Sequence, residues 1–132
     1  MVEPRHVHLI VAKHVQRYLK GMIDYGLRYV ADCEFRLVGY TDSDWVDSVT
    51  NQESTSQCCF SLGSAVIAWR SRKQTSVVLS TTEAEYIAAC LASSEVVWLR
   101  KMLSGLFDLK MDVTCIYCDN QSCIKLSTIQ CL

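Results

Sequence analysis

Apolar residues near the start of the chain recur at the spacing of an α-helix. Between residues 6 and 22 the apolar positions fall three or four apart, with basic residues between them: Leu9, Ala12, Val15, Leu19 and Met22. Gly21 and Gly26 bracket the end of this run, and glycine commonly interrupts a helix. The pattern predicts an amphipathic N-terminal helix.

The next segments carry the composition of β-strands. They cover residues 27–30, 35–40, 58–62 and 66–70, and a further apolar run follows at 76–79. A stretch rich in Asp, Ser and Asn separates the second strand candidate from the third, between Asp42 and Gln57. Gly63 and Ser64 form a tight connection between the last two candidates, which predicts a hairpin.

A second helix has the clearest start signal in the chain. Ser80 is followed three residues later by Glu83, which is the spacing of a capping box. Apolar residues then keep a helical period from about Thr82 to Leu103, and the helix is expected to end near Gly105.

The final part of the chain predicts one more strand and a short helix. Residues 113–118 read as a strand that ends in Asp119 and Asn120, and residues 121–126 begin a helix. Because a helix precedes this strand, it is expected to lie parallel to its neighbour. The order of elements predicts an α/β fold, with helices packed on a mixed sheet.

The composition excludes some classes of protein. The net charge of −1 indicates no particular partner, and no apolar run approaches the roughly 20 residues of a membrane span. The first 19 residues lack the apolar stretch of a signal peptide, so we expect a cytoplasmic or nuclear protein without membrane contact.

Eight cysteines raise the alternatives of disulfides and of zinc. Disulfide-rich scaffolds are polar and loop-rich, whereas half of this chain is apolar, so reduced and mostly buried thiols are favoured. Cys115 and Cys118 have the spacing of a zinc knuckle. Residues three apart in a strand point to opposite faces, however, which makes a knuckle the weaker interpretation. The aromatic residues Trp45, Tyr86 and Trp98 are expected in the core.

Three carboxylates are placed where an active site could form. Asp42 and Asp119 each end a predicted strand, and Glu85 lies in the first turns of the long helix. Carboxylates that converge at strand ends repel one another and attract a hard divalent cation such as Mg²⁺ or Mn²⁺. A pair of such ions, about 3.5–4 Å apart, can assist the hydrolysis of a phosphodiester. Taken alone, aspartates at strand ends are also common turn-formers.

Longer strings point to one family. Residues 39–45 (GYTDSDW), 80–89 (STTEAEYIAA) and 118–122 (CDNQS) resemble the ribonuclease H domain of copia-type retrotransposon Pol polyproteins. Shorter similar strings are 62–63 (LG), 67–69 (IAW), 72–74 (RKQ) and 98–100 (WLR). The leading helix, with 17–21 (RYLKG) and 24–27 (DYGL), resembles the segment that connects reverse transcriptase to ribonuclease H. Residues 1–30 are therefore expected to be connection-like, and residues 31–132 ribonuclease H-like.

The resemblance implies a ribonuclease H-like fold and a metal-dependent activity. Asp42, Glu85 and Asp119 would be the catalytic, metal-binding residues, with Mg²⁺ or Mn²⁺ as cofactor and the RNA strand of an RNA–DNA hybrid as substrate. Glu85 is chosen over Glu83 because its neighbours match the family pattern. Asp44 would be a structural or turn residue.

The resemblance also has departures. The family carries a fourth acid on a later helix, after a fifth strand, and this chain ends before both; residues 128–132 no longer resemble the family. We therefore expect a domain incomplete at its C-terminus, and whether it is an enzyme stays open. Arg70, Arg72 and Lys73 form a compact basic patch that could contact nucleic acid, although a solvated hairpin explains them equally well.

Fragments of this kind also resemble proteins catalogued as secreted RxLR-type effectors of oomycete plant pathogens. Here the string Arg17, Tyr18, Leu19 and Lys20 approximates the RxLR motif, and an ordinary amphipathic helix explains it as well. The alternative function is a non-catalytic, co-opted protein, secreted into the host cytoplasm or nucleus. There it would bind host proteins and modulate or suppress plant cell death. A decayed reading frame without a selected function is the third interpretation.

Overall fold

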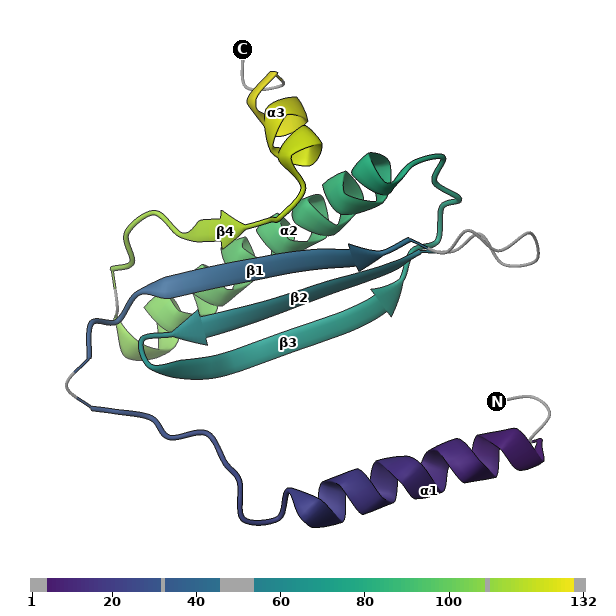
Figure 1. Cartoon of the computed structure of the whole chain (residues 1–132). Helices are drawn as coiled ribbons and strands as arrows, with labels where there is room; N and C mark the ends of the chain where they lie inside the picture. Colours follow the sequence, from purple (N-terminus) through teal and green to yellow (C-terminus); the bar gives the residue numbers. More distant parts are fainter. Residues whose placement is uncertain (1–4, 32, 46–53, 109, 130–132) are drawn as a thin grey trace.

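The computed structural model describes residues 5–31, 33–45, 54–108 and 110–129. Its elements are α1 (His6–Gly21), β1 (Leu37–Asp44), β2 (Thr55–Leu62), β3 (Ala65–Lys73), α2 (Thr81–Phe107), β4 (Cys115–Tyr117) and α3 (Gln121–Ile129). The strands form a single sheet with the long helix α2 along one face (Figure 1). This is the mixed α/β fold that the sequence predicts, and it is consistent with a ribonuclease H-like architecture.

The sheet has four strands in the order β3-β2-β1-β4. β1, β2 and β3 pair antiparallel as consecutive neighbours, whereas β4 pairs parallel with β1. The chain reaches β4 through α2, which is the crossover that parallel pairing requires. The predicted direction of the last strand is confirmed, and β1 is an interior strand.

The core lies between α2 and the sheet. It is built around buried residues of β1, β2 and α2, namely Leu37, Phe60, Ala92, Val96 and Leu99. Along α2 the positions closest to the sheet include Ala84, Ala88 and Ala92, with exposed fractions of 0%, 1% and 0%. Small side chains at this spacing let the helix backbone approach the strands closely. The N-terminal half of α2 is thereby held against the sheet.

The long helix begins as predicted and ends later than predicted. The side chain of Ser80 accepts a hydrogen bond from the backbone N–H of Glu83, which confirms the cap. The helix continues through Gly105 to Phe107, and Asp108 ends it with a positive φ of 52°. The helix runs slightly past the end predicted near Gly105, because a glycine in a helix costs only about 1 kcal/mol and Leu103 in the last turns is buried.

The segment before β1 is not the strand that the sequence predicts at residues 27–30. Instead, Tyr29 donates its hydroxyl hydrogen to the carbonyl of Val66 (2.7 Å), and the Val30 N–H donates to Ser64 Oγ (3.0 Å). This fastens the segment to the β2–β3 hairpin. The hairpin turns at Gly63, whose φ of +59° is one that L-residues rarely adopt.

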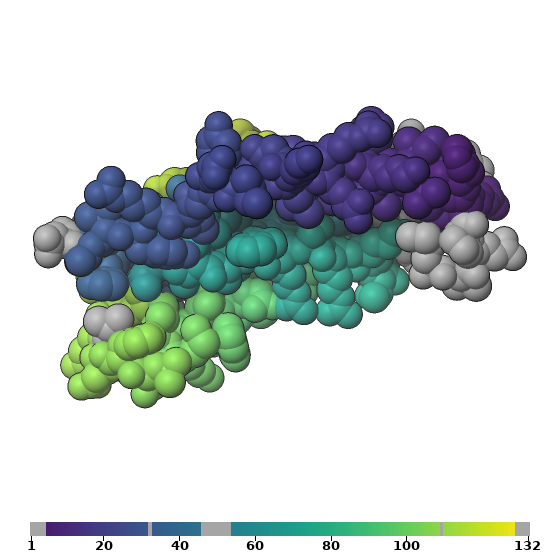
Figure 2. Space-filling view, turned by 90° about the horizontal axis from the view of Figure 1, so that it is seen from below, coloured from purple at the N-terminus to yellow at the C-terminus, as the bar shows by residue number. Residues whose placement is uncertain are grey.

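Helix α1 forms as predicted but contributes nothing to the core. Each of its residues except His8 is exposed, including the string Arg17, Tyr18, Leu19 and Lys20. In the view from below, α1 and the segment after it form one outer flank of the molecule (Figure 2). Among the helices that the structure describes, none has the length and apolar character needed to cross a membrane. The boundary near residue 30 stays a prediction.

Two expectations about burial are wrong. Trp45 and Trp98 are 40% and 57% exposed, because the space between α2 and the sheet is filled by Phe60 and small residues. The thiols were also predicted to be mostly buried. Of the seven described cysteines, all free thiols, Cys123 is buried and most of the others are only half-buried.

The core assignment predicts a large difference between two identical substitutions. Phe60 is 2% exposed and Phe107 is 63% exposed. Phe60→Ala should lower the free energy of unfolding by about 3–5 kcal/mol, because it leaves a cavity. Phe107→Ala should change it by no more than about 0.5 kcal/mol. Urea denaturation followed by circular dichroism measures both, and equal losses would contradict this core.

Candidate metal centre

The three predicted carboxylates come from three elements that meet at one end of the sheet. Tyr40 of β1 pairs with Tyr117 of β4, and Asp42 and Asp119 each lie two residues further along their strand direction. Because the strands are parallel, the two positions lie toward the same end of the sheet. Glu85 lies in the first turns of α2, which packs against β1.

Asp42 and Glu85 converge on one backbone donor. The N–H of Ser43 donates to Asp42 Oδ1 at 2.8 Å and to Glu85 Oε1 at 3.1 Å. Two carboxylates that share one N–H must lie close together. Asp42 lies within β1 and not at its end as the sequence predicts, since the strand runs on to Asp44.

Glu85 is also close to Asp119. One ligand atom each of Glu85, Cys118 and Asp119 lie within 4.8 Å of one another, the one group of this kind in the described parts of the chain. The thiol of Cys118 donates to Glu85 Oε2 at 3.8 Å. Glu85 therefore links Asp42 on one side with Cys118 and Asp119 on the other.

The surroundings of Glu85 oppose its ionisation. Only 6% of the residue is exposed, and burial raises the pKa of its carboxyl group. The Ser43 N–H acts in the opposite direction, while the negative charges of Asp42 and Asp119 raise the pKa further. A divalent cation among these carboxylates would remove the repulsion.

Two side chains that the sequence did not mark as functional hold this site in place. Gln74, 4% exposed, donates from Nε2 to the carbonyl of Ala84 (3.0 Å) and to Ser56 Oγ (2.8 Å), which ties the end of β3 to the turn of α2 that carries Glu85. Asn120 Oδ1 accepts from the N–H of Cys123 (2.9 Å) and so caps α3 directly after Asp119. A glutamine before a helix start gives no signal of this role, whereas Asn120 has the residue type of a cap.

The three residues of the predicted basic patch, Arg70, Arg72 and Lys73, have different surroundings. Arg70 forms an ion pair with Glu95 of α2. Arg72 and Lys73 are exposed at the end of β3, the strand separated from β1 by β2. Trp69, beside them in sequence, is 76% exposed. A role of these residues in nucleic-acid contact stays a prediction.

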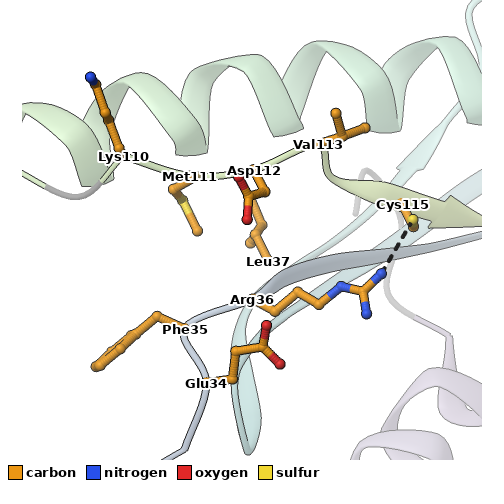
Figure 3. A pocket seen from close by; sticks show the side chains of 9 residues that line it. All are labelled: Glu34, Phe35, Arg36, Leu37, Lys110, Met111, Asp112, Val113 and Cys115. Atoms are coloured by element: carbon orange, nitrogen blue, oxygen red, sulfur yellow. Dashed lines mark hydrogen bonds between the residues drawn. The ribbon is translucent and has the colours of Figure 1, made fainter.

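A hollow of about 490 Å³ lies at the opposite end of the strands, where β1 and β4 begin (Figure 3). Its charged lining mixes Glu34 and Asp112 with Arg36 and Lys110, and Arg36 Nη2 donates to Cys115 Sγ at 3.7 Å. The hollow and the carboxylate group are therefore separate features.

No protein-family model matches the chain. The chain is 38% identical over 124 residues to the Retrovirus-related Pol polyprotein from transposon TNT 1-94 of Nicotiana tabacum. The aligned residues make up 94% of this chain and 9% of that polyprotein. It is 37% identical over 117 residues to the Retrovirus-related Pol polyprotein from transposon RE2 of Arabidopsis thaliana, 89% of this chain and 8% of the relative.

A shorter relative is covered over most of its length. The chain is 42% identical over 97 residues to Secreted RxLR effector protein 161 of Plasmopara viticola. The aligned residues make up 74% of this chain and 68% of the effector. The two polyproteins place the chain in a class of transposon-derived proteins. The chain belongs to the family of the copia-type retrotransposon Pol polyproteins, together with this effector-named relative.

The charge of Glu85 predicts a pH-dependent stability. Its folded-state pKa lies above the ordinary value of 4.5, so the stability contributed by protonated Glu85 is full below 4.5 and is lost as the pH rises through the folded pKa. Glu85→Gln should therefore raise the urea midpoint at pH 7 in metal-free buffer, and the gain should shrink as the pH falls toward 4.5.

The control for this experiment is Glu34→Gln, since Glu34 is exposed and lies at the other end of the sheet. The control should leave the midpoint unchanged at both pH values. A Glu85→Gln protein less stable than the wild type at pH 7 would show that the buried charge is already compensated.

Proposed function

We propose that the chain is a metal-dependent nuclease that hydrolyses the RNA strand of RNA–DNA hybrids with Mg²⁺ or Mn²⁺. The observation that carries this proposal is the convergence of Asp42, Glu85 and Asp119 at one edge of the sheet. The membership in the Pol family and the ribonuclease H-like topology support it. The chain covers only 9% of the tobacco polyprotein, so the proposal concerns this one activity alone.

The donor set suits a hard divalent cation. Asp42, Glu85 and Asp119 would hold it through carboxylate oxygens, the ligands that Mg²⁺ and Mn²⁺ prefer. When bound, the metal supplies a polarised water and neutralises charge that develops on the phosphate. A bound cation would also offset the repulsion from Asp42 and Asp119, which adds to burial in raising the pKa of Glu85.

The chain's own residues prepare the site before any ligand binds. The Ser43 N–H orients Asp42 and Glu85 toward one point. Gln74 fixes the turn of α2 that carries Glu85. Asp119 and Asp42 are exposed, which leaves this point accessible to a polynucleotide. Arg72 and Lys73 are candidates for contacts with its phosphates.

The proposal predicts hydrolysis that depends on Asp119 and on the metal. The purified chain should cleave a labelled RNA–DNA hybrid with Mg²⁺ and not with a chelator. Asp119→Asn should lower the rate at least about 100-fold, because it removes one of the groups that stabilise the transition state through the metal.

The matched control is Asp112→Asn, the same substitution at an exposed residue near the start of β4. It should keep the wild-type rate. Equal cleavage by the wild type and Asp119→Asn would assign the activity to a contaminant and refute the proposal.

The identity to Secreted RxLR effector protein 161 favours a second candidate, a non-catalytic effector that acts inside plant cells. Its partners would be host proteins, and the exposed helix α1 with Arg17, Tyr18, Leu19 and Lys20 is the segment most accessible to them.

The effector candidate predicts that expression of the chain in leaf tissue changes the extent of cell death caused by an elicitor. The doubly substituted chain Asp42→Asn/Asp119→Asn should act equally well, because no chemistry is required. Unchanged cell death, together with absence of the protein from the culture filtrate of its source, would end this candidate.

A further inference from the structure

The carboxylate group contains one donor that a magnesium site does not need. The sulfur of Cys118 belongs to the same cluster of ligand atoms as Glu85 and Asp119, all within 4.8 Å of one another. Mg²⁺ is bound through oxygen, whereas thiolates select zinc and other thiophilic ions. The group therefore offers both oxygen and sulfur ligands.

The structure holds Cys118 in this position from two sides. Its thiol donates to Glu85 Oε2 at 3.8 Å. On the other side, the side chain of Cys123 is hydrogen-bonded to Cys118, and Cys123 is buried, with 1% exposed. Asn120 fixes the turn between them by capping α3. The sulfur therefore faces the carboxylates as part of a defined arrangement and not as a single mobile side chain.

We propose that Glu85, Cys118 and Asp119 form a binding site for Zn²⁺ or another thiophilic divalent ion, with one coordination position open to solvent. Three protein ligands and an open position are the arrangement of non-structural zinc sites. Asp119 is exposed, so an ion can enter from solvent. Binding releases the thiol proton of Cys118 to the solvent, and the thiolate then completes the ligand set.

This site differs from a zinc knuckle of Cys115 and Cys118. Cys115 lies two strand positions before Tyr117, and its sulfur accepts a hydrogen bond from Arg36 in the hollow at the other end of β4. The proposed ligands thus include one cysteine and two acids.

The zinc site shares Glu85 and Asp119 with the proposed nuclease site, so the two ions compete for the same carboxylates. A substitution of Asp42 distinguishes the two proposals, since Asp42 would be required for hydrolysis and is not among the proposed zinc ligands. The inference does not depend on hydrolysis, and either proposal can fail alone.

Cobalt(II) is the probe, because it occupies zinc sites and gives a near-ultraviolet charge-transfer absorption when a thiolate is bound. The metal-free chain should develop this absorption with a midpoint at one equivalent or less. Cys118→Ser should abolish it. Cys59→Ser, which removes an equally half-buried thiol from β2, should leave it unchanged. Asp42→Asn should also keep the absorption while losing hydrolysis.

Competition and alkylation test the same site in the wild-type chain, where no variant has to fold. Zn²⁺ should displace the cobalt signal, and an excess of Mg²⁺ should not. Zn²⁺ should also protect the Cys118 peptide from iodoacetamide in a mass-spectrometric digest, with the Cys59 peptide as internal control. Absorption that persists in Cys118→Ser, or equal displacement by Mg²⁺, or unprotected Cys118, would overturn the proposal.

Discussion

The packing of the alanine stripe of α2 against the sheet is the contact on which the candidate centre depends. Ala84, Ala88 and Ala92 are essentially inaccessible to solvent, and they allow the helix to lie close to β1 and β2. Glu85 follows the first of these alanines, so the same close approach that builds the core carries a carboxylate to the strand edge. A larger side chain at Ala84 or Ala88 would move Glu85 away from the Ser43 N–H, and core and site would fail together.

The three carboxylates of the centre interact unfavourably in the folded chain. A buried carboxylate is disfavoured by desolvation, and two further acids nearby increase the cost. The hydrogen bonds from Ser43 and Cys118 offset only part of this, because the pKa of Glu85 stays raised. A positive charge at that point would lower this cost. Either proposed ion would supply that charge, and the two differ in whether Cys118 would join the ligand set.

Local signals in the sequence predict most of the fold. The Ser80 cap, the glycine hairpin and the parallel direction of the last strand each depend on a few neighbouring residues, and the structure confirms all three. The contact of Cys118 with Glu85 could not be predicted in this way. The strand was expected to include Cys118, but it ends at Tyr117, so the side chain is released from the alternation of the strand and contacts Glu85. That contact also requires the position of α2, which no local pattern contains.

The fold alone does not choose between the nuclease and the effector, because the chain is similar in sequence to both kinds of relative and a fold can carry unrelated functions. The carboxylates do bear on the choice. The buried carboxylate of Glu85 lowers the stability of the fold whatever the protein does, since buried charges are commonly less favourable than hydrophobic packing. Glu85 is nevertheless aligned by the Ser43 N–H beside Asp42 and lies within ligand distance of Asp119. A partner surface on the exposed helix α1 would give no reason for this alignment, whereas the proposed cation would.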